Sequence, residues 1–386
     1  MIKPLLTHEI GSLAKPNWRV KAISGIRLND DDIEYARKWG DFLKEDYGEL
    51  LDILRKRENF TQEEKGKIIY YSSLFATRLL EKAGLDVVFD GEQHRVEMYE
   101  HPVKNIDGFR FYGHVRSFDN KYYRKAAITE EPKLKRFYHL DEYKTISSFA
   151  KRDVKIPLTG AYTLVDWSFD EYYLKGVEIG VKGVVERRKK ARWEFLKNIS
   201  ENVIKPNIKA LIDEGAKFIQ IDEPAATTKR NEIDIFVDSA IASVGENKGK
   251  AFFGMHICFS NYFLLFPEIK RLEGYINELH FEYANRDTKE LGVSEDKRRG
   301  YEILKILRDY NFVVGLGVLD VHTDFIEPAE LIRDRVLFAL EIIQDPNRIF
   351  VAPDCGLRTR TWEVAYEKLC RMVEGVEMVK NKLKVG

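Results

Sequence analysis

Short apolar runs that alternate with long, charge-rich segments constrain the fold of this chain more than any other feature of its sequence. Each run ends in polar or glycine residues, and the segments between runs have the periodicity of amphipathic helices. Eight strands alternating with helices predict an α/β fold of the (β/α)8 TIM barrel type, in which parallel strands form a closed sheet. The runs are residues 5–12, 86–91, 156–162, 218–223, 251–258, 278–283, 312–322 and 349–355, and the clearest helical segments are 184–211, 298–310 and 328–343.

A doubly wound open sheet is the alternative that the same alternation allows. Such a sheet normally has a glycine-rich, nucleotide-binding turn between a strand and a helix. Here Gly315-Leu316-Gly317 lies inside a strand-like run, so we interpret the two glycines as room for packing. The barrel is therefore the preferred prediction.

Two segments are longer than an ordinary barrel connection. Residues 13–85 predict a helical insertion after the first strand, and residues 92–150 predict a β-hairpin insertion after the second, with its turn near Asp119-Asn120. Insertions after barrel strands lie on the catalytic face, so both are candidate walls or lids, although residues 13–85 could serve only to stabilise the barrel. We expect a single domain over residues 1–386. The helical patterns are 31–54, 62–71 and 72–83, and the alternating aromatic stretch of the hairpin is 109–128.

The charge balance excludes several classes of partner. Lysine plus arginine equals aspartate plus glutamate, at 63 each in 386 residues, so no net field attracts nucleic acid or an anionic membrane. The amino terminus lacks the apolar core of a signal peptide, and no apolar run is long enough to cross a bilayer. We therefore expect a cytoplasmic protein that binds neither nucleic acid nor membranes.

The segment Gly254-Met255-His256-Ile257-Cys258 predicts a metal site. If the whole run is a strand, its period of two places His256 and Cys258 on the same face. Imidazole and thiolate suit zinc, which prefers four nitrogen and sulfur ligands in a tetrahedron. Glu282 and Cys355, each near the end of another strand-like run, are candidates for the other two positions. The alternative is a buried histidine beside a buried free cysteine; the third cysteine, Cys370, is expected in the core beside a helical apolar stripe.

Ionisable residues recur where the predicted strands end. In a barrel these ends supply the catalytic groups, although each acid could instead cap a helix, as Asp222-Glu223-Pro224 and Asp354 could. The candidate zinc ligands are spread over about a hundred residues of sequence, whereas structural zinc usually has closely spaced ligands. This spread favours catalysis, and a thiolate-rich zinc suits activation of a substrate thiol for attack on an electrophilic carbon.

At these same positions the sequence resembles the catalytic half of the cobalamin-independent methionine synthase family. The motifs appear in the family's order and extend over nearly the whole chain. They are Ile10-Gly11-Ser12, Asp90-Gly91-Glu92, Asp166-Trp167-Ser168-Phe169, Gln220-Ile221-Asp222-Glu223-Pro224-Ala225, His256-Ile257-Cys258, Asp320-Val321-His322 and Pro353-Asp354-Cys355-Gly356-Leu357.

The resemblance implies a role for each matching residue. Trp167 would pack on the pterin of the methyl donor, and His322 would be the proton donor. The zinc ligands would be His256, Cys258, Glu282 and Cys355, and the residues that hold the amino-acid end of homocysteine would be Ile10, Gly11, Ser12, Glu92 and Asp222.

The sequence departs from the family in the part that concerns the methyl donor. The two-barrel enzymes have an amino-terminal barrel that is absent here. The acid expected to contact the pterin corresponds to Thr227 or Thr228, and the arginine expected in the hairpin corresponds to Lys121 or Arg124. These differences leave the thiol half of the reaction intact.

We therefore predict a zinc-dependent methyltransferase that converts homocysteine to methionine, with methylfolate or another methylpterin, or a methyl-corrinoid protein, as the donor. One alternative is a related enzyme that alkylates another thiol such as coenzyme M, or that takes its methyl group from a corrinoid protein. The acids Glu92 and Asp222 suit an ammonium group and oppose the sulfonate of coenzyme M. The second alternative is a non-enzymatic barrel with structural zinc.

Overall fold

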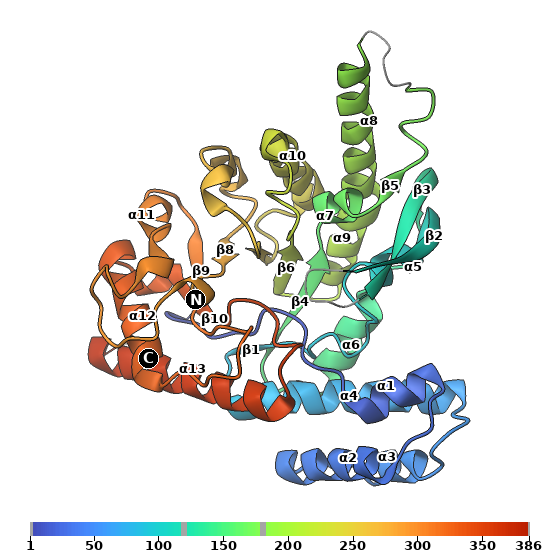
Figure 1. Cartoon of the computed structure of the whole chain (residues 1–386), viewed down its shortest axis with the longest axis vertical. Coiled ribbons are helices and arrows are strands. Elements are labelled where there is room, and N and C mark those ends of the chain that lie inside the picture. The colour runs from blue at the N-terminus through green and yellow to red at the C-terminus, as the bar shows by residue number, and fades with distance from the viewer. Residues whose placement is uncertain (1–2, 117–121, 178–182, 385–386) are drawn as a thin grey trace.

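The central sheet consists of parallel strands and is strongly curled (Figure 1). The computed structural model describes residues 3–116, 122–177 and 183–384. Within them the sheet has seven strands in the order β1-β4-β6-β7-β8-β9-β10, and every neighbouring pair is parallel. The strands are β1 (Val87–Val88), β4 (Asp153–Thr159), β6 (Phe218–Asp222), β7 (Phe252–His256), β8 (Glu278–Phe281), β9 (Val313–Gly317) and β10 (Ile349–Ala352).

The first predicted strand is reduced to two isolated parallel bridges. Thr7 pairs with Val351 of β10, and His8 pairs with Val87 of β1, so this segment lies between the two edges of the sheet. The left-handed conformation of Leu5 (φ 51°) interrupts the extended backbone just before the bridges. The alternation of strands and helices was thus predicted correctly as an α/β fold, with seven of the eight runs forming named strands.

Several strands end earlier than predicted. The run 312–322 forms a strand only over Val313–Gly317, and the run 251–258 ends at His256. Cys258 therefore lies beyond β7, and the prediction that it shares a strand face with His256 is wrong. The residues past these strand ends form loops at one rim of the sheet, so apolar runs overstate the length of the strands.

The glycines of β9 provide room for neighbouring side chains, as interpreted from the sequence. A Cβ atom on Gly315 would lie 2.4 Å from Glu278 Oε1, and one on Gly317 would lie 2.3 Å from Asp354 Oδ1. Main-chain atoms are also too close, since the same Cβ atoms would lie 2.8 Å from His280 Cα and 2.8 Å from the Phe281 carbonyl oxygen, so a side chain would clash at either position.

Helices cover the outside of the sheet. The segments 184–211 and 328–343 were predicted correctly, the former as α8 and α9 joined by a π-helical turn at Ser200–Ile204. Cys370 lies partly buried in α13, as expected. The helices after β1 are α5 (Glu100–Lys104), α6 (Leu140–Phe149), α7 (Ala161–Asp166), α8 (Val184–Ile199), α9 (Lys205–Asp213), α10 (Ile233–Val244), α11 (Leu304–Leu307), α12 (Ala329–Ile343) and α13 (Trp362–Leu383).

The helix predicted over 298–310 is wrong. The structure has a 3₁₀ turn at Arg299–Tyr301 and a single α-helical turn at α11. Arg298 is buried in an ion pair with Asp287 (2.7 Å), and Gly300 lies so close to the carbonyl of Tyr283 that a Cβ atom would be 2.3 Å from it. These tertiary contacts hold the segment in an irregular conformation until Leu304.

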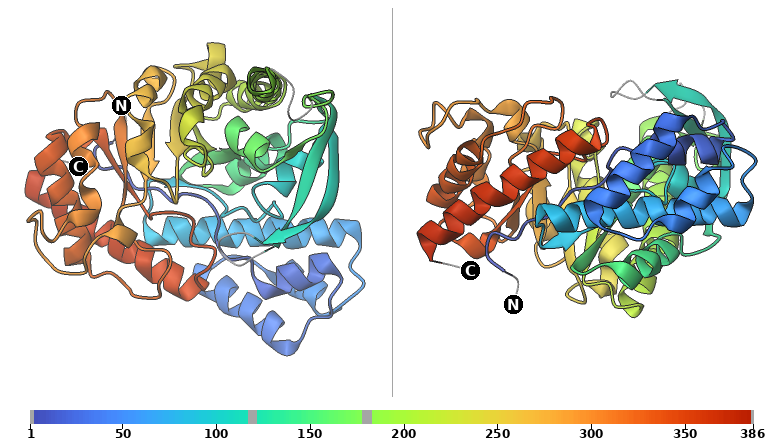
Figure 2. Two further views of the ribbon diagram at one scale, coloured as in Figure 1. Left: turned by 45° about the horizontal axis from the view of Figure 1, so that its top comes forward. Right: turned by 90° about the horizontal axis from the view of Figure 1, so that it is seen from below.

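The segment between His8 and β1 forms four helices, α1 (Asn17–Ser24), α2 (Asp30–Leu43), α3 (Gly48–Leu54) and α4 (Gln62–Ala83). Asn29 and Thr61 begin α2 and α4 with capping boxes, in which each side chain accepts a hydrogen bond from the third helical residue. The two patterns predicted at 62–71 and 72–83 form the one helix α4. Figures 1 and 2 show these helices as a layer on one side of the molecule, alongside α13.

The predicted hairpin is present between β1 and β4. Strands β2 (Ile106–Arg116) and β3 (Tyr122–Leu134) pair antiparallel, and β3 also pairs with the short β5 (Phe169–Asp170). The predicted turn at Asp119-Asn120, and Lys121, lie outside the described residues. Among the described residues, no helix is both long and apolar enough to cross a membrane.

Candidate active site

A pocket of about 260 Å³ opens where the strands of the central sheet end. Every site residue predicted from the sequence lines it except Glu282. Strand ends explain this convergence, because Asp222 and His256 are the last residues of β6 and β7, and the carboxyl ends of parallel strands meet at one rim. The predicted lining residues are Ile10, Gly11, Ser12, Glu92, Trp167, Asp222, His256, Cys258, His322 and Cys355; Met98, Pro224, Phe259, Val321, Gly356, Arg358 and Thr359 complete the wall.

His256, Cys258 and Cys355 form a compact group of possible metal ligands. One donor atom from each lies within 4.8 Å of the other two. His256 Nδ1 is 2.8 Å from His280 Nδ1, whereas its Nε2 is buried and has no hydrogen-bond partner among the described residues. A hydrogen bond to Cys355, and then burial, raises the pKa of the Cys258 thiol. The group therefore offers one nitrogen and two sulfur atoms to a common point.

Glu282 lies beside this group but neither lines the pocket nor belongs to the compact group. It follows β8, and its Oε2 accepts a hydrogen bond from the main-chain nitrogen of Phe259 (2.9 Å). Its Oε1 is buried without a partner among the described residues. Burial raises the pKa of Glu282, while its charge contributes to the raised pKa of Cys258, which places the carboxylate close to the thiols.

Two acids, Glu92 and Asp222, line the pocket together. Glu92 has a left-handed backbone (φ 63°), a conformation that costs on the order of 1 kcal/mol or more for a non-glycine residue and recurs at functional sites. Burial raises the pKa of Asp222 to about 7. The hydrogen bond from Gln220 (2.6 Å) lowers this pKa, and the negative charge of Glu92 raises it. The two carboxylates thus repel each other across the pocket, and a cation between them would be stabilised.

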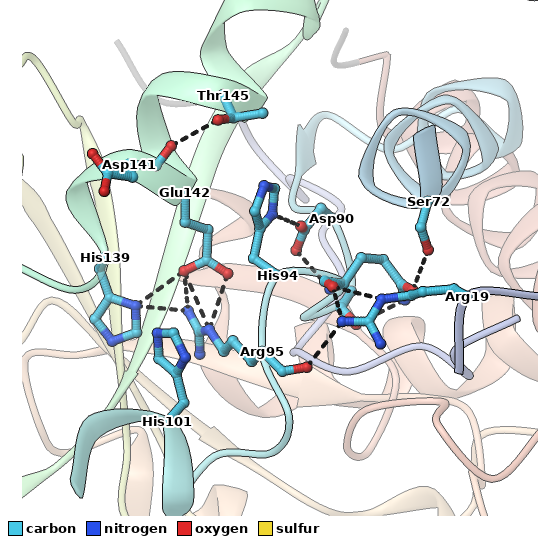
Figure 3. Close-up of polar contacts among 12 residues, drawn as sticks. Arg19, Ser72, Asp90, His94, Arg95, His101, His139, Asp141, Glu142 and Thr145 are labelled. Atoms are coloured by element: carbon cyan, nitrogen blue, oxygen red, sulfur yellow. Dashed lines mark hydrogen bonds and ion pairs between the residues drawn. The ribbon is translucent and has the colours of Figure 1, made fainter. Parts of the chain in front are cut away.

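Near Glu92 in the sequence, Arg95 joins a buried network with Glu142 and His139, beside the pair of Asp90 and His94 (Figure 3). Arg95 Nη1 is 3.7 Å from Glu92 Oε1, and the same guanidinium bonds both oxygens of Glu142. Asp90, His94 and Glu142 also have the spacing of metal ligands. However, Arg95 already donates to Glu142, and His94 Nδ1 bonds Asp90 Oδ2 at 2.6 Å. These contacts make the group an internal network that joins the Glu92 loop to α6.

An aromatic wall closes one side of the pocket. Trp167, at the end of α7, lies 5.7 Å from Tyr123 of the hairpin strand β3 at an angle of 31°. Tyr99 contacts both rings and hydrogen-bonds Ser168 Oγ at 2.8 Å. The hairpin thus contacts the Trp167 ring, but no residue of β2 or β3 lines the pocket, so its role as a wall stays a prediction.

His322 lies at the solvent-exposed edge of the pocket. Its main-chain nitrogen donates to Asp320 Oδ1 (2.9 Å), and its ring packs edge-on against Phe259 with centroids 5.1 Å apart. Phe259, like Glu92, has a left-handed backbone (φ 50°). The imidazole is therefore exposed to solvent while it lines the pocket.

Two acids of the predicted motifs act as caps instead of lining the pocket. Glu223 accepts hydrogen bonds from the main-chain nitrogens of Tyr162 and Thr163 at the start of α7. Asp354 accepts three more, from residues 283–285, which fixes the loop after Glu282 next to Cys355. Neither acid opens a helix of its own, so the helix-capping alternative is wrong in that form: Glu223 binds the start of α7 and Asp354 binds the main chain of residues 283–285, both far away in sequence.

Sequence reasoning did not single out three residues behind the predicted acids. Gln220 contacts Asp222, Arg95 contacts Glu92, and Lys155 bonds Gln220. Gln220 precedes Asp222 by two positions on β6, so the period of two along a strand could have indicated that both face the same side. Nothing local in the sequence connects Arg95 with Glu142, which lies 47 residues away.

Comparison with known proteins gives consistent matches. A sequence model described as the catalytic domain of cobalamin-independent synthase matches residues 40–378. The chain is 37% identical to a methionine synthase of Thermoplasma acidophilum and 41% identical to one of Thermoplasma volcanium, over 96% of both chains in each case. A B12-independent methionine synthase from Shewanella sp. W3-18-1, solved in complex with selenomethionine, has a similar fold, with a TM-score of 0.72 at 20% identity over 99% of both chains.

Proposed function

The chain belongs to the cobalamin-independent methionine synthase family by its catalytic domain, and from this premise we propose that it transfers a methyl group to the sulfur of homocysteine. The observation that carries the proposal is the composition of one pocket. It places a thiol- and imidazole-rich group within reach of the two acids Glu92 and Asp222. The thiol and imidazole group can hold a metal that activates a substrate thiol, and the acid pair can bind the ammonium group of the same amino acid.

We propose that His256, Cys258 and Cys355 bind zinc, with Glu282 as the fourth ligand. The donor set suits this metal, and the unpartnered His256 Nε2 and Glu282 Oε1 are buried polar atoms that a metal would satisfy. The bond between His256 Nδ1 and His280 leaves Nε2 as the ligand atom and fixes the ring. A bound zinc ion would lower the pKa of the substrate thiol and keep it as a thiolate at neutral pH.

The acid pair and the segment Ile10-Gly11-Ser12 would orient the substrate. Glu92 and Asp222 attract an ammonium group, and residues 10–12 line the same pocket. Gly356 follows Cys355 and lies against Ser12, because a Cβ atom at this position would be 2.8 Å from the Ser12 nitrogen. This close packing keeps the amino-acid site at a constant distance from a thiol ligand.

Methyl transfer needs a donor surface and a proton. For a methylpterin donor, Trp167, which lines the pocket, offers an aromatic face to the ring system, and His322 can protonate the leaving nitrogen. The sulfur of homocysteine forms a bond to the methyl carbon as the bond between the donor and the methyl group breaks. The electron pair of the broken bond stays with the donor. We propose a methyl-corrinoid as the preferred donor, because Thr228, at a position where the family's pterin contact is expected, bonds Asp166 instead of presenting an acid.

We infer further that the sheet functions as a closed (β/α)8 barrel, with Thr7 and His8 in the place of the first strand. Their bridges join the two edges of the sheet. Closure would bring Ile10, Gly11 and Ser12 to the rim that carries the other site residues. On this view residues 1–386 act as one domain, with the helices α1–α4 and the β2–β3 hairpin as insertions after the first and second strands.

The proposal is tested by offering homocysteine with methylcobalamin, a methyl-corrinoid protein or methylfolate to the zinc-loaded protein and quantifying methionine. We expect methionine from at least one donor and its loss in Cys355→Ser. Replacing homocysteine by coenzyme M should give no methylated product, because its sulfonate meets the acid pair. No methionine from any donor, with one zinc bound per chain, would refute the proposed function.

A further inference from the structure

Gln220 and Lys155 form a buried chain of hydrogen bonds that ends at the acid wall of the pocket. We propose that Gln220, held in one orientation by Lys155, is a positioning residue that sets the selectivity of the pocket for thiols with an α-amino group. The inference rests on the proposed function, because it takes Asp222 as the group that receives the substrate ammonium.

The chain begins at Lys155 on β4. Its Nζ bonds His8 Nδ1 (2.9 Å), Gln220 Oε1 (2.5 Å) and the carbonyl oxygen of Glu9. His8 Nε2 lies 3.1 Å from Glu278 Oε1, so Nε2 carries the ring hydrogen and Nδ1 is an acceptor. Three acceptors around one nitrogen require three hydrogens. Lys155 is therefore an ammonium group here, although burial lowers its pKa.

The contact with Ile10 fixes the orientation of the Gln220 amide. A main-chain carbonyl oxygen only accepts, so the amide nitrogen must face Ile10 and the amide oxygen must face Lys155. Gln220 Nε2 then donates its two hydrogens to Ile10 O (2.7 Å) and to Asp222 Oδ1 (2.6 Å). Both hydrogens are used, and a flipped amide would bring two oxygens together at Asp222.

Both groups that Gln220 holds line the pocket. Ile10 and Asp222 belong to the proposed amino-acid site, whereas Gln220 (2% exposed) and Lys155 (5% exposed) lie behind it. The bond to Oδ1 restrains rotation of the Asp222 carboxylate. It also favours the ionised form, against the burial that raises the pKa of Asp222 to about 7. An ionised, fixed carboxylate is what recognition of an ammonium group requires.

The selectivity can be measured with two thiols that differ only in the amino group, homocysteine and 4-mercaptobutanoate. Titration calorimetry of the zinc-loaded protein gives a Kd for each. In Gln220→Leu we expect the Kd for homocysteine to rise about 10-fold or more, as for a lost charge-assisted hydrogen bond, and the Kd for 4-mercaptobutanoate to stay within about twofold. Zinc content should be unchanged.

A second variant guards against misfolding. Gln220→Glu has nearly the same shape and keeps an acceptor for Lys155, but it replaces both donors by an oxygen next to Asp222. It should lose homocysteine affinity at least as strongly as Gln220→Leu. The matched control is Asn207→Leu in α9, which removes another buried side-chain amide, one that donates to Val203 O (2.8 Å) in the preceding π-helical turn. This control should leave the ratio of the two Kd values unchanged.

The outcomes distinguish a failure of the proposed function from a failure of the role of Gln220. A wild-type protein with no preference for homocysteine over 4-mercaptobutanoate would overturn the proposed function and this inference with it. A wild-type preference that persists in both Gln220 variants, or a parallel loss of both thiols, would overturn the role of Gln220 alone.

Discussion

Arg95 ties the loop that carries Glu92 to helix α6, and its replacement by methionine should weaken the fold and the site together. The guanidinium is 1% exposed and bonds Glu142 at 2.8 to 3.2 Å and the carbonyl oxygen of Pro157 at 2.5 Å. Methionine would fill most of the space but leave the Glu142 carboxylate, 3% exposed, without its cation. Removing one partner of a buried ion pair costs about 3–5 kcal/mol.

The cost should depend on pH in a defined direction. Burial alone would raise the pKa of Glu142, but the charge of Arg95, followed by His139, outweighs it and lowers the pKa. In the wild type, the stability that the ionised Glu142 contributes through its pair with Arg95 is present above the ordinary glutamate pKa. It is lost as pH falls towards the lowered pKa of Glu142 in the folded protein. In the variant, burial without the cation raises the pKa of Glu142. The difference between the two proteins should therefore be greatest near pH 7 and shrink towards pH 4.

Urea denaturation at pH 7 and at pH 4.5 measures both effects. The double variant Arg95→Met/Glu142→Gln should recover part of the lost stability, because it removes the uncompensated charge. Arg27→Met serves as the control, since its pair with Glu58 is exposed and should contribute no more than about 1 kcal/mol. An Arg95→Met cost below about 1 kcal/mol, or a cost that grows as pH falls, would refute the reasoning.

The remaining predictions concern the chemistry of the pocket. X-ray absorption should find one zinc per chain with two sulfur neighbours, rising to three when homocysteine displaces Glu282, because carboxylate oxygen competes poorly with thiolate; an unchanged sulfur count would contradict this. His322→Ala should slow methionine formation from methylfolate, whose leaving nitrogen needs a proton, by about 10²-fold or more while zinc and homocysteine binding persist, and His114→Ala, on the exposed face of β2, should not slow it. Methylcobalamin or a methyl-corrinoid protein should be a better donor than methyltetrahydrofolate with few glutamates. Saturable use of the monoglutamate at micromolar concentration would contradict this preference and show that methylfolate is an efficient donor.

Local patterns in the sequence were enough to predict much of this site. The apolar runs fixed which residues follow a strand, and parallel strands must end at a common rim, so His256, Asp222 and Cys355 could be predicted to converge although they are up to 133 residues apart. The same reasoning failed where a strand stops early. Cys258 lies beyond the end of β7, and its approach to Cys355 depends on the loop that Phe259 and Glu282 hold together.

By itself, then, the sequence determined the alternation of strands and helices, the hairpin and the residue types at the strand ends, because these depend on periodicities within a few residues. The tertiary structure alone decided the irregular segment before α11, where Asp287 binds Arg298, and the supports behind the acids. Lys155 meets Gln220 across 65 residues, and His8 meets Glu278 across 270. Such contacts have no local signature, because a buried polar side chain is stable only where the fold brings a complementary partner to it.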